Sequence, residues 1–455
     1  MRQITDQYHF IGIGGDGMSG LAQVLREQGC QVSGSNLEEN HRVRELRPLG
    51  IPVYLGHDPE YLPPAGTVVF SSAIPAENRE LRAARQRQLR VIHRQDLLAE
   101  LMNQRPSIGV AGTHGKTTTT AMIALLFERS GLDPTFLIGS PSRSLGGHAK
   151  WGSGTHLIAE VDESDGYFTG LKAQMAVITN IDRDHLNYYG NEEALEHSFG
   201  RFLSGSEYAV LSADDPHTPW LQRRAARLLT FGFAPQADLQ ARRLERDGLR
   251  TRCRLFFQGR RLGELELAVP GRHNVANALA ALAVGHLNGL KFGAMCSILR
   301  EFSLPERRFQ VLEEQGMTVV DDYAHLPTQI KINLETIREG WTPRRLWAVF
   351  QPHRYSRMRY MSQQFAQAFA LADRVIVTDI YPAFEQPIPG VSARQVAQAI
   401  AREHPQVHYA QDKEEVLRLL RCQARPGDFI IGFGPGDIWQ VLYRFAALGR
   451  PQIKG

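Results

Sequence analysis

Short apolar runs alternate with helical patterns along the whole chain. Residues 8–11 form the first apolar run and a glycine-rich turn follows. Leu21, Val24 and Leu25 then share one face of a helix predicted over residues 18–28. The same order returns at residues 108–111, where a second glycine-containing turn leads into a helix that ends at Arg129. Strand, turn and helix in this order are typical of doubly wound α/β units with parallel strands.

Further buried strands are predicted at residues 31–33, 68–70, 156–159, 175–178, 346–350, 375–377 and 429–431. Polar residues and prolines interrupt the pattern at 104–107 and at 304–306. We therefore expect three α/β domains in series, over residues 1–105, 106–305 and 306–455. The first and last should be Rossmann-like, and the central one should be of the P-loop type with a mostly parallel sheet.

Composition narrows the class of protein. Of the 455 residues, 43% are hydrophobic and 22% are charged, as in globular proteins, and no apolar run reaches the roughly 20 residues of a membrane helix. The first residues lack the layout of a signal peptide, so we expect a cytoplasmic location and no membrane partner. A net charge of +4 without basic blocks argues against nucleic-acid binding. The four cysteines lack C-x-x-C spacing, which favours reduced thiols.

The strongest local signal is the segment 112–118, Gly-Thr-His-Gly-Lys-Thr-Thr, between a predicted strand and a predicted helix. Backbone N–H groups of such a loop surround phosphate oxygens, Lys116 would neutralise the β and γ phosphates, and Thr117 would ligate magnesium. The spacing is not the full G-x-x-x-x-G-K-[ST] pattern. Its place between strand and helix nevertheless favours nucleotide binding over a chance glycine-rich turn.

Two polar segments follow apolar strands and should reach the same edge of the sheet. Glu160 comes directly after a strand, which favours metal ligation by its carboxylate. Asp162, Glu163 and Asp165 fit a solvated acidic loop or a helix N-terminus equally well. The next strand ends in residues 179–185, where His185 is a candidate ligand of a second metal.

Residues 12–17 match G-x-G-x-x-G after a strand. This match is compatible with a dinucleotide and equally with the diphosphate of a UDP-sugar. A nicotinamide site requires an acidic residue about 20 positions further on. The second strand leads instead into Ser35 and Asn36, which makes the UDP-sugar more coherent with the ATP loop of the next domain.

In the last third of the chain, residues 321–325 and 351–357 are polar clusters that each follow an apolar run. Together they form a candidate wall of a ligand cleft. Arg354 and Arg357 would share one face if a helix begins here, and their planar guanidinium groups suit phosphate or carboxylate. Surface arginines that cap a helix are the alternative.

Taken in order, these segments resemble the Mur ligase family over essentially the whole chain. The resemblance is carried by residues 9–20, 71–74, 112–120, 160–165, 179–185, 271–278, 307–310, 321–325, 351–357, 378–389 and 434–439. It implies three α/β domains, one for UDP, one for ATP and one that closes over both. It also implies ligation of L-alanine to the lactyl carboxylate of UDP-N-acetylmuramate in peptidoglycan synthesis. The reaction would use ATP and Mg²⁺ and pass through an acyl phosphate, in a monomer or weak homodimer.

The resemblance further implies roles for single residues. Catalytic roles fall to Lys116, His185, His325 and Arg354. ATP would be bound by Gly112, Thr113, His114, Gly115, Lys116, Thr117, Thr118, His273, Asn274, Asn277, Arg307 and Asp322. The UDP-substrate would be bound by Gly14, Gly17, Ser72, Tyr323, His325, Arg354 and Arg357, and the metal by Thr117, Glu160 and His185.

Four positions depart from what the resemblance leads us to expect. Asp16 replaces an apolar residue, Asn36 an acid, Leu326 a histidine and Phe384 a glycine. A carboxylate at Asp16 beside a diphosphate would weaken binding unless it points away. Three alternatives stay open: a sister ligase that recycles a murein tripeptide, a dehydrogenase that uses the first glycine loop, and a non-catalytic homologue that binds UDP-muramate.

Overall fold

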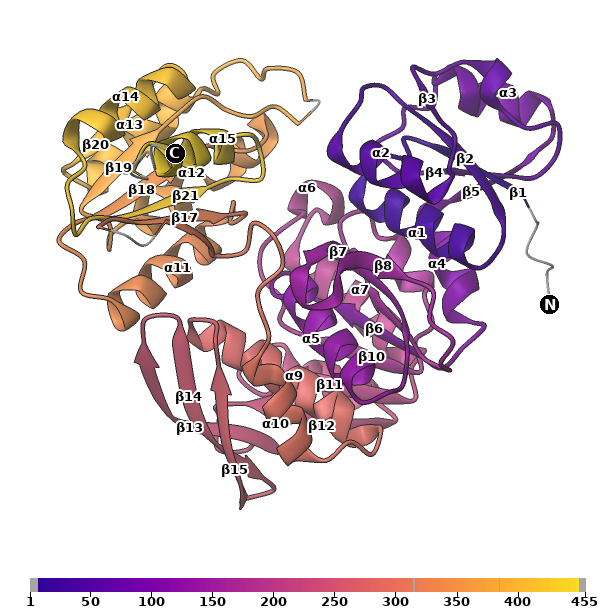
Figure 1. The fold of residues 1–455 in the computed structure, drawn as a ribbon, viewed down its shortest axis with the longest axis horizontal. Helices are drawn as coiled ribbons and strands as arrows, with labels where there is room; N and C mark the ends of the chain where they lie inside the picture. Colours follow the sequence, from indigo (N-terminus) through magenta and orange to yellow (C-terminus); the bar gives the residue numbers. More distant parts are fainter. Residues whose placement is uncertain (1–6, 314–315, 384, 450–455) are drawn as a thin grey trace, which may run out of the picture. The chain divides into compact units, whose positions relative to one another are not determined.

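The computed structural model describes residues 7–313, 316–383 and 385–449, whose strands form three sheets (Figure 1). The chain divides into two compact units. The first unit contains residues 1–244, 252–268 and 274–305, and the second contains residues 245–251, 269–273 and 306–455. No helix of the described ranges is long and apolar enough to cross a bilayer.

The N-terminal sheet of the first unit has five parallel strands in the order β3-β2-β1-β4-β5. The strand order reverses between β1 and β4, and ligands of doubly wound folds bind at the carboxyl ends of the strands at such a point. The elements are β1 Gln7–Ile11, α1 Asp16–Glu27, β2 Gln31–Asn36, α2 His41–Leu46, η1 Arg47–Leu49, β3 Val53–Leu55, η2 Pro59–Tyr61, β4 Thr67–Phe70, α3 Arg79–Gln86, β5 Arg90–His93 and α4 Arg94–Met102.

The central sheet has ten strands in the order β15-β14-β13-β12-β11-β10-β6-β9-β7-β8. In the order of the sheet, the neighbouring strands β13, β12, β11, β10, β6, β9 and β7 pair in parallel. The strand β8 pairs antiparallel with β7. The elements are β6 Ser107–Ala111, α5 Lys116–Arg129, β7 Thr135–Ser142, η3 Arg143–Leu145, β8 Gly147–Lys150, β9 Leu157–Glu160, η4 Tyr167–Gly170, β10 Met175–Ile178, α6 Leu186–Tyr189, α7 Glu192–Ser204, β11 Tyr208–Ser212, α8 Thr218–Leu221, η5 Gln222–Arg224, β12 Arg227–Gly232, β13 Leu239–Asp247, β14 Arg250–Phe257, β15 Arg260–Leu267, α9 Arg272–Leu287 and α10 Phe292–Arg300.

The third sheet lies in the second unit and has six strands in the order β16-β17-β21-β18-β19-β20. All its pairs are parallel except β16 with β17. The elements are β16 Gln310–Glu313, β17 Thr318–Asp322, α11 Pro327–Gly340, β18 Leu346–Phe350, α12 Tyr355–Ala368, β19 Arg374–Val377, α13 Ala393–Glu403, β20 Val407–Tyr409, α14 Lys413–Gln423, β21 Phe429–Phe433 and α15 Trp439–Gly449. The predicted fold class, three α/β parts with mostly parallel sheets, is confirmed.

Strands in the middle of the central sheet and of the third sheet are buried along their whole length. The strands β6, β10, β18 and β21 are buried at every position, as expected for strands with helices on both sides. In the first unit one apolar cluster extends from Phe10 and Leu21 to Phe168 and Phe199, so the N-terminal and central sheets share a core. Gly20 on α1 allows close approach, since a Cβ there would lie 3.2 Å from a methyl group of Leu137 on β7.

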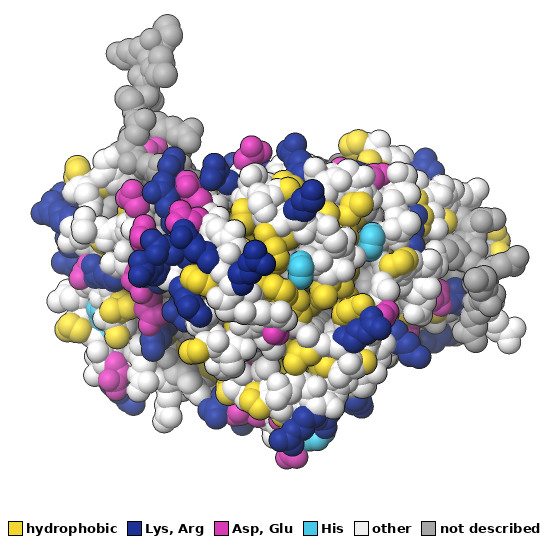
Figure 2. Space-filling model, turned by 90° about the horizontal axis from the view of Figure 1, so that it is seen from below, with side chains coloured by type: hydrophobic (Ala, Val, Ile, Leu, Met, Phe, Trp, Pro, Cys, Tyr) yellow, Lys and Arg dark blue, Asp and Glu magenta, His cyan; other side chains and the backbone are white. Residues whose placement is uncertain are grey.

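The surface mixes both signs of charge. Figure 2 shows one face on which Lys and Arg side chains lie among Asp and Glu side chains and apolar ones. On the strands β13 to β15, exposed arginines pair with glutamates, as Arg252 does with Glu266 at 3.2 Å. Such interleaving is typical of a solvated surface and differs from the continuous basic stripe of nucleic-acid-binding proteins.

Candidate functional site

The loop between β6 and α5 has a backbone that requires glycine at two positions. Gly112 has φ +132° and Gly115 has φ +79°, and a Cβ on Gly112 would overlap the hydroxyl of Thr179. The loop is fixed to the end of β10, because the backbone N–H of His114 donates to Asn180 Oδ1 at 2.9 Å. The two segments that the sequence places at one sheet edge therefore touch in the structure.

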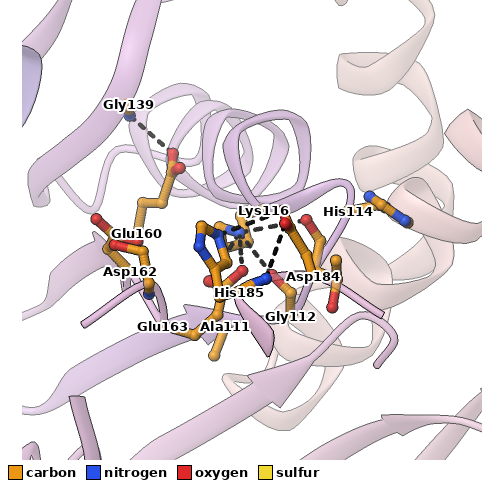
Figure 3. A network of polar contacts seen from close by, with 12 residues as sticks. Ala111, Gly112, His114, Lys116, Gly139, Glu160, Asp162, Glu163, Asp184 and His185 are labelled. Carbon is orange, nitrogen blue, oxygen red and sulfur yellow. Dashed lines mark hydrogen bonds and ion pairs between the residues drawn. The ribbon is translucent and has the colours of Figure 1, made fainter. Parts of the chain in front are cut away.

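Lys116 is the first residue of α5 and turns back into its own loop (Figure 3). Its Nζ donates to the carbonyl of Gly112 at 2.6 Å and to that of Thr113 at 3.3 Å. It also lies 2.9 Å from Oε1 and 2.8 Å from Oε2 of Glu163. Lys116 thus stands at the predicted place, with a carboxylate partner that sequence reasoning left among the ordinary acidic-loop residues.

Three carboxylates surround this lysine. Burial lowers the pKa of Lys116, but the charges of Glu163, Glu160 and Asp162 outweigh burial and raise the pKa above its ordinary value. Burial raises the pKa of Glu163 to about 7 even though Lys116 acts to lower it. Burial acts in the same direction on Asp162, yet the cations of Arg94 and Lys116 prevail and hold its pKa well below the usual range. Three carboxylates thus face the cations of Lys116 and Arg94 at this edge, a balance that favours a divalent cation.

The predicted metal ligands Thr117 and Glu160 lie side by side. Thr117 Oγ1 donates to Glu160 Oε1 at 3.1 Å. The other carboxylate oxygen of Glu160 accepts from the N–H of Gly139 at 2.8 Å (Figure 3). His185 begins the turn into α6 with φ +55°, and its Nε2 lies 3.3 Å from Asp184. Within the described residues no group of three or more His, Cys, Asp or Glu is arranged to hold a metal. A hydroxyl beside a carboxylate nevertheless fits Mg²⁺, which takes few protein ligands and completes its shell with water and phosphate oxygens.

Asn274, Asn277 and Thr118 are further residues that are predicted to bind ATP. Asn277 Oδ1 accepts from the hydroxyl of Thr119 at 3.2 Å, and its Nδ2 donates to Asn274 Oδ1 at 3.2 Å. A Cβ on Gly115 would overlap Asn277. Thr118 is buried in the first turn of α5. Asn277 thus contacts the phosphate loop and its helix and is itself held by Asn274, and the predicted contact of both with the adenine stays a prediction.

The first glycine loop, after β1, is tied down by two asparagines. The N–H of Gly14 donates to Asn36 Oδ1 at 3.1 Å, and the carbonyl of Gly14 accepts from Asn40 Nδ2 at 3.0 Å. A Cβ on Gly17 would lie 2.8 Å from Nη1 of Arg94, so the guanidinium group of Arg94 covers the loop at this point. Asn36, which stands where an acid was expected, is therefore a neutral hydrogen-bond acceptor for the loop backbone.

Ser72 and Arg94 link the two sheets of the first unit. Ser72 Oγ donates to Asp165 Oδ2 at 2.7 Å and lies 3.0 Å from Nε2 of His93. Arg94 forms an ion pair with Asp162. The acidic segment 160–165 therefore contacts Ser72, which is predicted to bind the UDP-substrate, and Arg94 as well as Lys116.

Asp16 points to a buried arginine. Arg42 on α2, whose side chain is 3% exposed, donates its Nε–H to Asp16 Oδ1 at 2.8 Å and its Nη1–H to Glu45 at 2.9 Å. The same Nη1 lies 3.4 Å from Nδ1 of His148 on β8. The exposed carboxylate of Asp16 is therefore paired with a buried cation, which answers the electrostatic objection raised by the sequence.

The second unit carries the other predicted residues, and Arg307 lies among them with φ +58°. Its guanidinium group donates to the carbonyls of Gly434 at 2.6 Å, Pro435 at 2.9 Å and Gly436 at 3.2 Å, and to Asp321 Oδ2 at 3.1 Å. Arg307 thus organises the loop between β21 and α15, and contact with ATP stays a prediction.

Asp322, at the end of β17, has a carboxylate that is occupied within the protein. It accepts from the N–H of Phe309 at 2.6 Å and from that of Ala324 at 2.7 Å. His273, assigned to the adenine side, also belongs to this unit, since the division between the units falls directly after it.

Tyr323 and His325 lie on the turn after β17. The guanidinium carbon of Arg308 lies 4.9 Å from the ring centre of Tyr323. Nδ1 of His325 lies 3.0 Å from the carbonyl of Tyr323, so this nitrogen carries the proton. Burial, reinforced by Arg357, lowers the pKa of His325 well below its ordinary value, and the ring is neutral.

Arg354 and Arg357 do not share one face of a helix as the sequence suggested. The helix α12 begins at Tyr355, and Arg354 precedes it with φ +67°. Arg357 lies within the first turn of α12, and its Nη1 lies 3.0 Å from Nδ1 of His353. The Nε of Arg354 is buried with no hydrogen-bond partner among the described atoms, which leaves this group available for an anionic ligand. Leu326 is buried at the start of α11, and Phe384 lies outside the described residues.

The chain has a phosphate-binding loop at the carboxyl edge of a parallel sheet, with acid and hydroxyl oxygens beside it. Two further sheets in the chain are combined with helices. These features define a P-loop-type nucleotide-binding protein. Three family models match in series: "Mur ligase family, catalytic domain" over residues 7–106, "Mur ligase middle domain" over 110–285 and "Mur ligase, glutamate ligase domain" over 307–436. The chain belongs to the Mur ligase family.

Several relatives that match over nearly the whole chain carry the same name. The UDP-N-acetylmuramate--L-alanine ligase of Pelotomaculum thermopropionicum is 45% identical over 440 residues, which cover 95% of each chain. That of Syntrophotalea carbinolica is 43% identical over 439 residues, which cover 95% of this chain and 96% of the relative. The crystal structure of UDP-N-acetylmuramate-alanine ligase from Thermotoga maritima has a TM-score of 0.84 at 29% identity and covers 97% of this chain and 98% of its own. A murein peptide ligase from Psychrobacter arcticus shares the fold, with a TM-score of 0.72 at 23% identity, and covers 98% and 99%.

Proposed function

We propose that this protein is an ATP-dependent ligase that joins L-alanine to the lactyl carboxylate of UDP-N-acetylmuramate, a step of peptidoglycan synthesis in the cytoplasm. The observation that carries the proposal is the Lys116 loop, in a chain that matches alanine-adding relatives over nearly its whole length. Neutralisation of Asp16 by Arg42 supports diphosphate binding at the first glycine loop.

The chemistry demands stabilisation of a transferring phosphoryl group. The γ-phosphate of ATP passes to the lactyl carboxylate, the amine of L-alanine attacks the resulting acyl phosphate, and inorganic phosphate leaves. Lys116 neutralises phosphate charge, and the loop N–H groups orient the phosphates. Arg354 and Arg357 of the second unit would supply guanidinium groups for the anionic substrate, and Nε2 of the neutral His325 ring, which carries no proton, could accept a hydrogen bond.

Magnesium belongs to this proposal because of the donors that the edge offers. Thr117 and Glu160 would hold the ion, with His185 at a second position. An ion held there would supply positive charge against the negative charge that develops on the phosphate oxygens. Glu160 is already oriented by the N–H of Gly139, so one of its oxygens stays directed at Thr117.

The test is phosphate release with UDP-N-acetylmuramate, ATP, Mg²⁺ and L-alanine. Lys116→Ala should lower turnover at least a hundredfold, because one charge donor to a phosphoryl transition state contributes about 3–4 kcal/mol. Lys172→Ala, at an exposed lysine in the connection between η4 and β10, is the matched control and should retain wild-type turnover. Unchanged turnover in Lys116→Ala would contradict the assignment.

The acceptor separates the two ligase types. L-alanine and the murein tripeptide should be compared at equal concentration in the same assay. We expect turnover with L-alanine and little with the tripeptide. The opposite preference would assign the recycling reaction instead.

A further inference from the structure

Glu163 makes a contact that the proposed reaction does not explain. Both of its carboxylate oxygens lie within 2.9 Å of Lys116 Nζ, and Gly112 and Thr113 accept from the same ammonium group. An ammonium group has three N–H donors, so protein oxygens satisfy all three. A phosphate oxygen can bind Lys116 only if one of these protein oxygens gives up its place.

The acidic partner is the contact that a phosphate would replace. The side chain of Glu163 is 2% exposed and that of Lys116 is 16% exposed, so the ion pair lies largely out of water, where charge–charge attraction is strong. The two carbonyls belong to the loop that would itself wrap the phosphates. Glu163 instead comes from another segment of the chain and carries the same sign of charge as a phosphate.

The backbone around Glu163 is fixed. The hydroxyl of Tyr189 on α6 donates to the carbonyl of Glu163, and the N–H of Gly166 donates to the same carbonyl at 3.3 Å. Asp162, the preceding residue, is held by Arg94. The carboxylate of Glu163 can therefore return to Lys116 without refolding of its loop.

We propose that Glu163 is a positioning residue that competes with the nucleotide phosphates for Lys116. This inference rests on the proposed ATP site. While phosphate is bound, Lys116 turns to it and the Glu163 charge opposes the ligand. After phosphoryl transfer, Glu163 pairs with the Lys116 ammonium group again, which weakens the binding of ADP and speeds its release.

A purely structural role of Glu163 predicts the opposite result. If the carboxylate only holds the loop in shape, its removal loosens the loop and weakens nucleotide binding. If it competes for Lys116, its removal strengthens binding. The direction of the change in affinity for ADP therefore distinguishes the two roles.

The experiment measures ADP binding by calorimetry, with and without Mg²⁺, and ADP release by stopped flow with a fluorescent analogue. Glu163→Gln keeps the shape of the side chain and removes its charge. We expect the Kd for ADP to fall about tenfold and release to slow by a similar factor, the order expected for one opposing charge in a partly buried site. Glu163→Asp keeps the charge but shortens the reach, and should give an intermediate Kd. Glu193→Gln, at an exposed glutamate on α7, is the control and should match wild type.

Two results would overturn the inference. A Kd for Glu163→Gln equal to or weaker than that of wild type, with an unchanged circular dichroism spectrum, would assign Glu163 a structural role and leave the proposed ligase intact. Wild-type protein that binds no ADP at all would overturn the ATP site and this inference together.

Discussion

At the residue scale, the charges that stand out in the sequence are neutralised by partners far away in the chain. Asp16 pairs with Arg42, and Arg42 also approaches the ring of His148 at 3.4 Å. Nε2 of His148 lies 3.2 Å from Ser19 Oγ, and that hydroxyl donates to the carbonyl of Asp16. With Arg42 donating to Nδ1, the proton of the neutral ring lies on Nε2, so both ring nitrogens of His148 have a partner.

This group predicts a pH dependence of stability. Burial, reinforced by the charge of Arg42, lowers the pKa of His148 from 6.5 to about 4 against the opposing charges of Asp16 and Glu45. In the unfolded chain, His148 therefore binds a proton below about pH 6.5, whereas in the folded protein it binds one only below about pH 4. The contribution to stability is present above pH 6.5, and up to roughly 3 kcal/mol is lost as the pH falls to 4.

His148→Gln removes this titration. Between pH 7.5 and pH 5, the free energy of unfolding of wild type should fall more than that of the variant, as measured by urea denaturation. His41→Gln, at an exposed histidine of α2, serves as the control and should follow wild type. Parallel profiles for wild type and His148→Gln would refute the idea that this ring is held neutral.

At the element scale, the phosphate loop depends on the space that Gly112 leaves for the end of β10. Gly112→Ala would place a methyl group onto Thr179 Oγ1 and would strain a φ of +132°. We expect ADP affinity to fall at least tenfold in calorimetry. Gly293→Ala, where no atom lies within 4 Å of the new methyl group, should leave binding unchanged. Normal affinity in Gly112→Ala would show that the loop adapts.

Arg307 makes a second element-scale prediction, for the loop between β21 and α15. Lysine cannot reproduce a planar fork that reaches three carbonyls and Asp321, and hydrogen bonds from a charged group contribute about 1.5–3 kcal/mol each. Arg307→Lys should therefore destabilise the second unit by about 2 kcal/mol or more. Thermal unfolding should show this loss, whereas Arg344→Lys, at an exposed arginine, should stay within about 0.5 kcal/mol of wild type. Equal stability of the two variants would exclude this role of Arg307.

The same elements show what the sequence could and could not predict. Residues 175–178 and 346–350 are strands as predicted, because buried parallel strands are continuous apolar runs. The strands β13 to β15 were missed, since their many arginines hide the alternation of buried and exposed positions. The meeting of residues 112–118 with 160–165 followed from the rule that parallel strands end at one edge. Which acid faces which cation did not, because Glu163 and Lys116 are 47 positions apart and their pairing depends on side-chain packing.

At the scale of the whole molecule, the predicted site residues divide between the two compact units. The phosphate loop, Thr117 and Glu160 belong to the first unit, and Arg307, His325 and Arg354 belong to the second. The chain passes between the units at residues 244–245, 251–252, 268–269, 273–274 and 305–306. Residues of both units should therefore contribute to the chemical step, whereas the phosphate loop lies on the first unit alone.

Arg354→Ala tests this division, because the Nε of Arg354 is buried without a partner and a ligand would be its natural acceptor. Loss of one guanidinium group from a charge-stabilising site should lower kcat by about a hundredfold or more. The Kd for ADP should stay within about threefold of wild type, or less than 1 kcal/mol, since the phosphate loop lies on the other unit. Arg359→Ala, at an exposed arginine of the same helix, controls for loss of charge on α12. If Arg354→Ala instead abolished ADP binding, the two functions would not be separable in this way. Unchanged turnover would remove Arg354 from the reaction altogether.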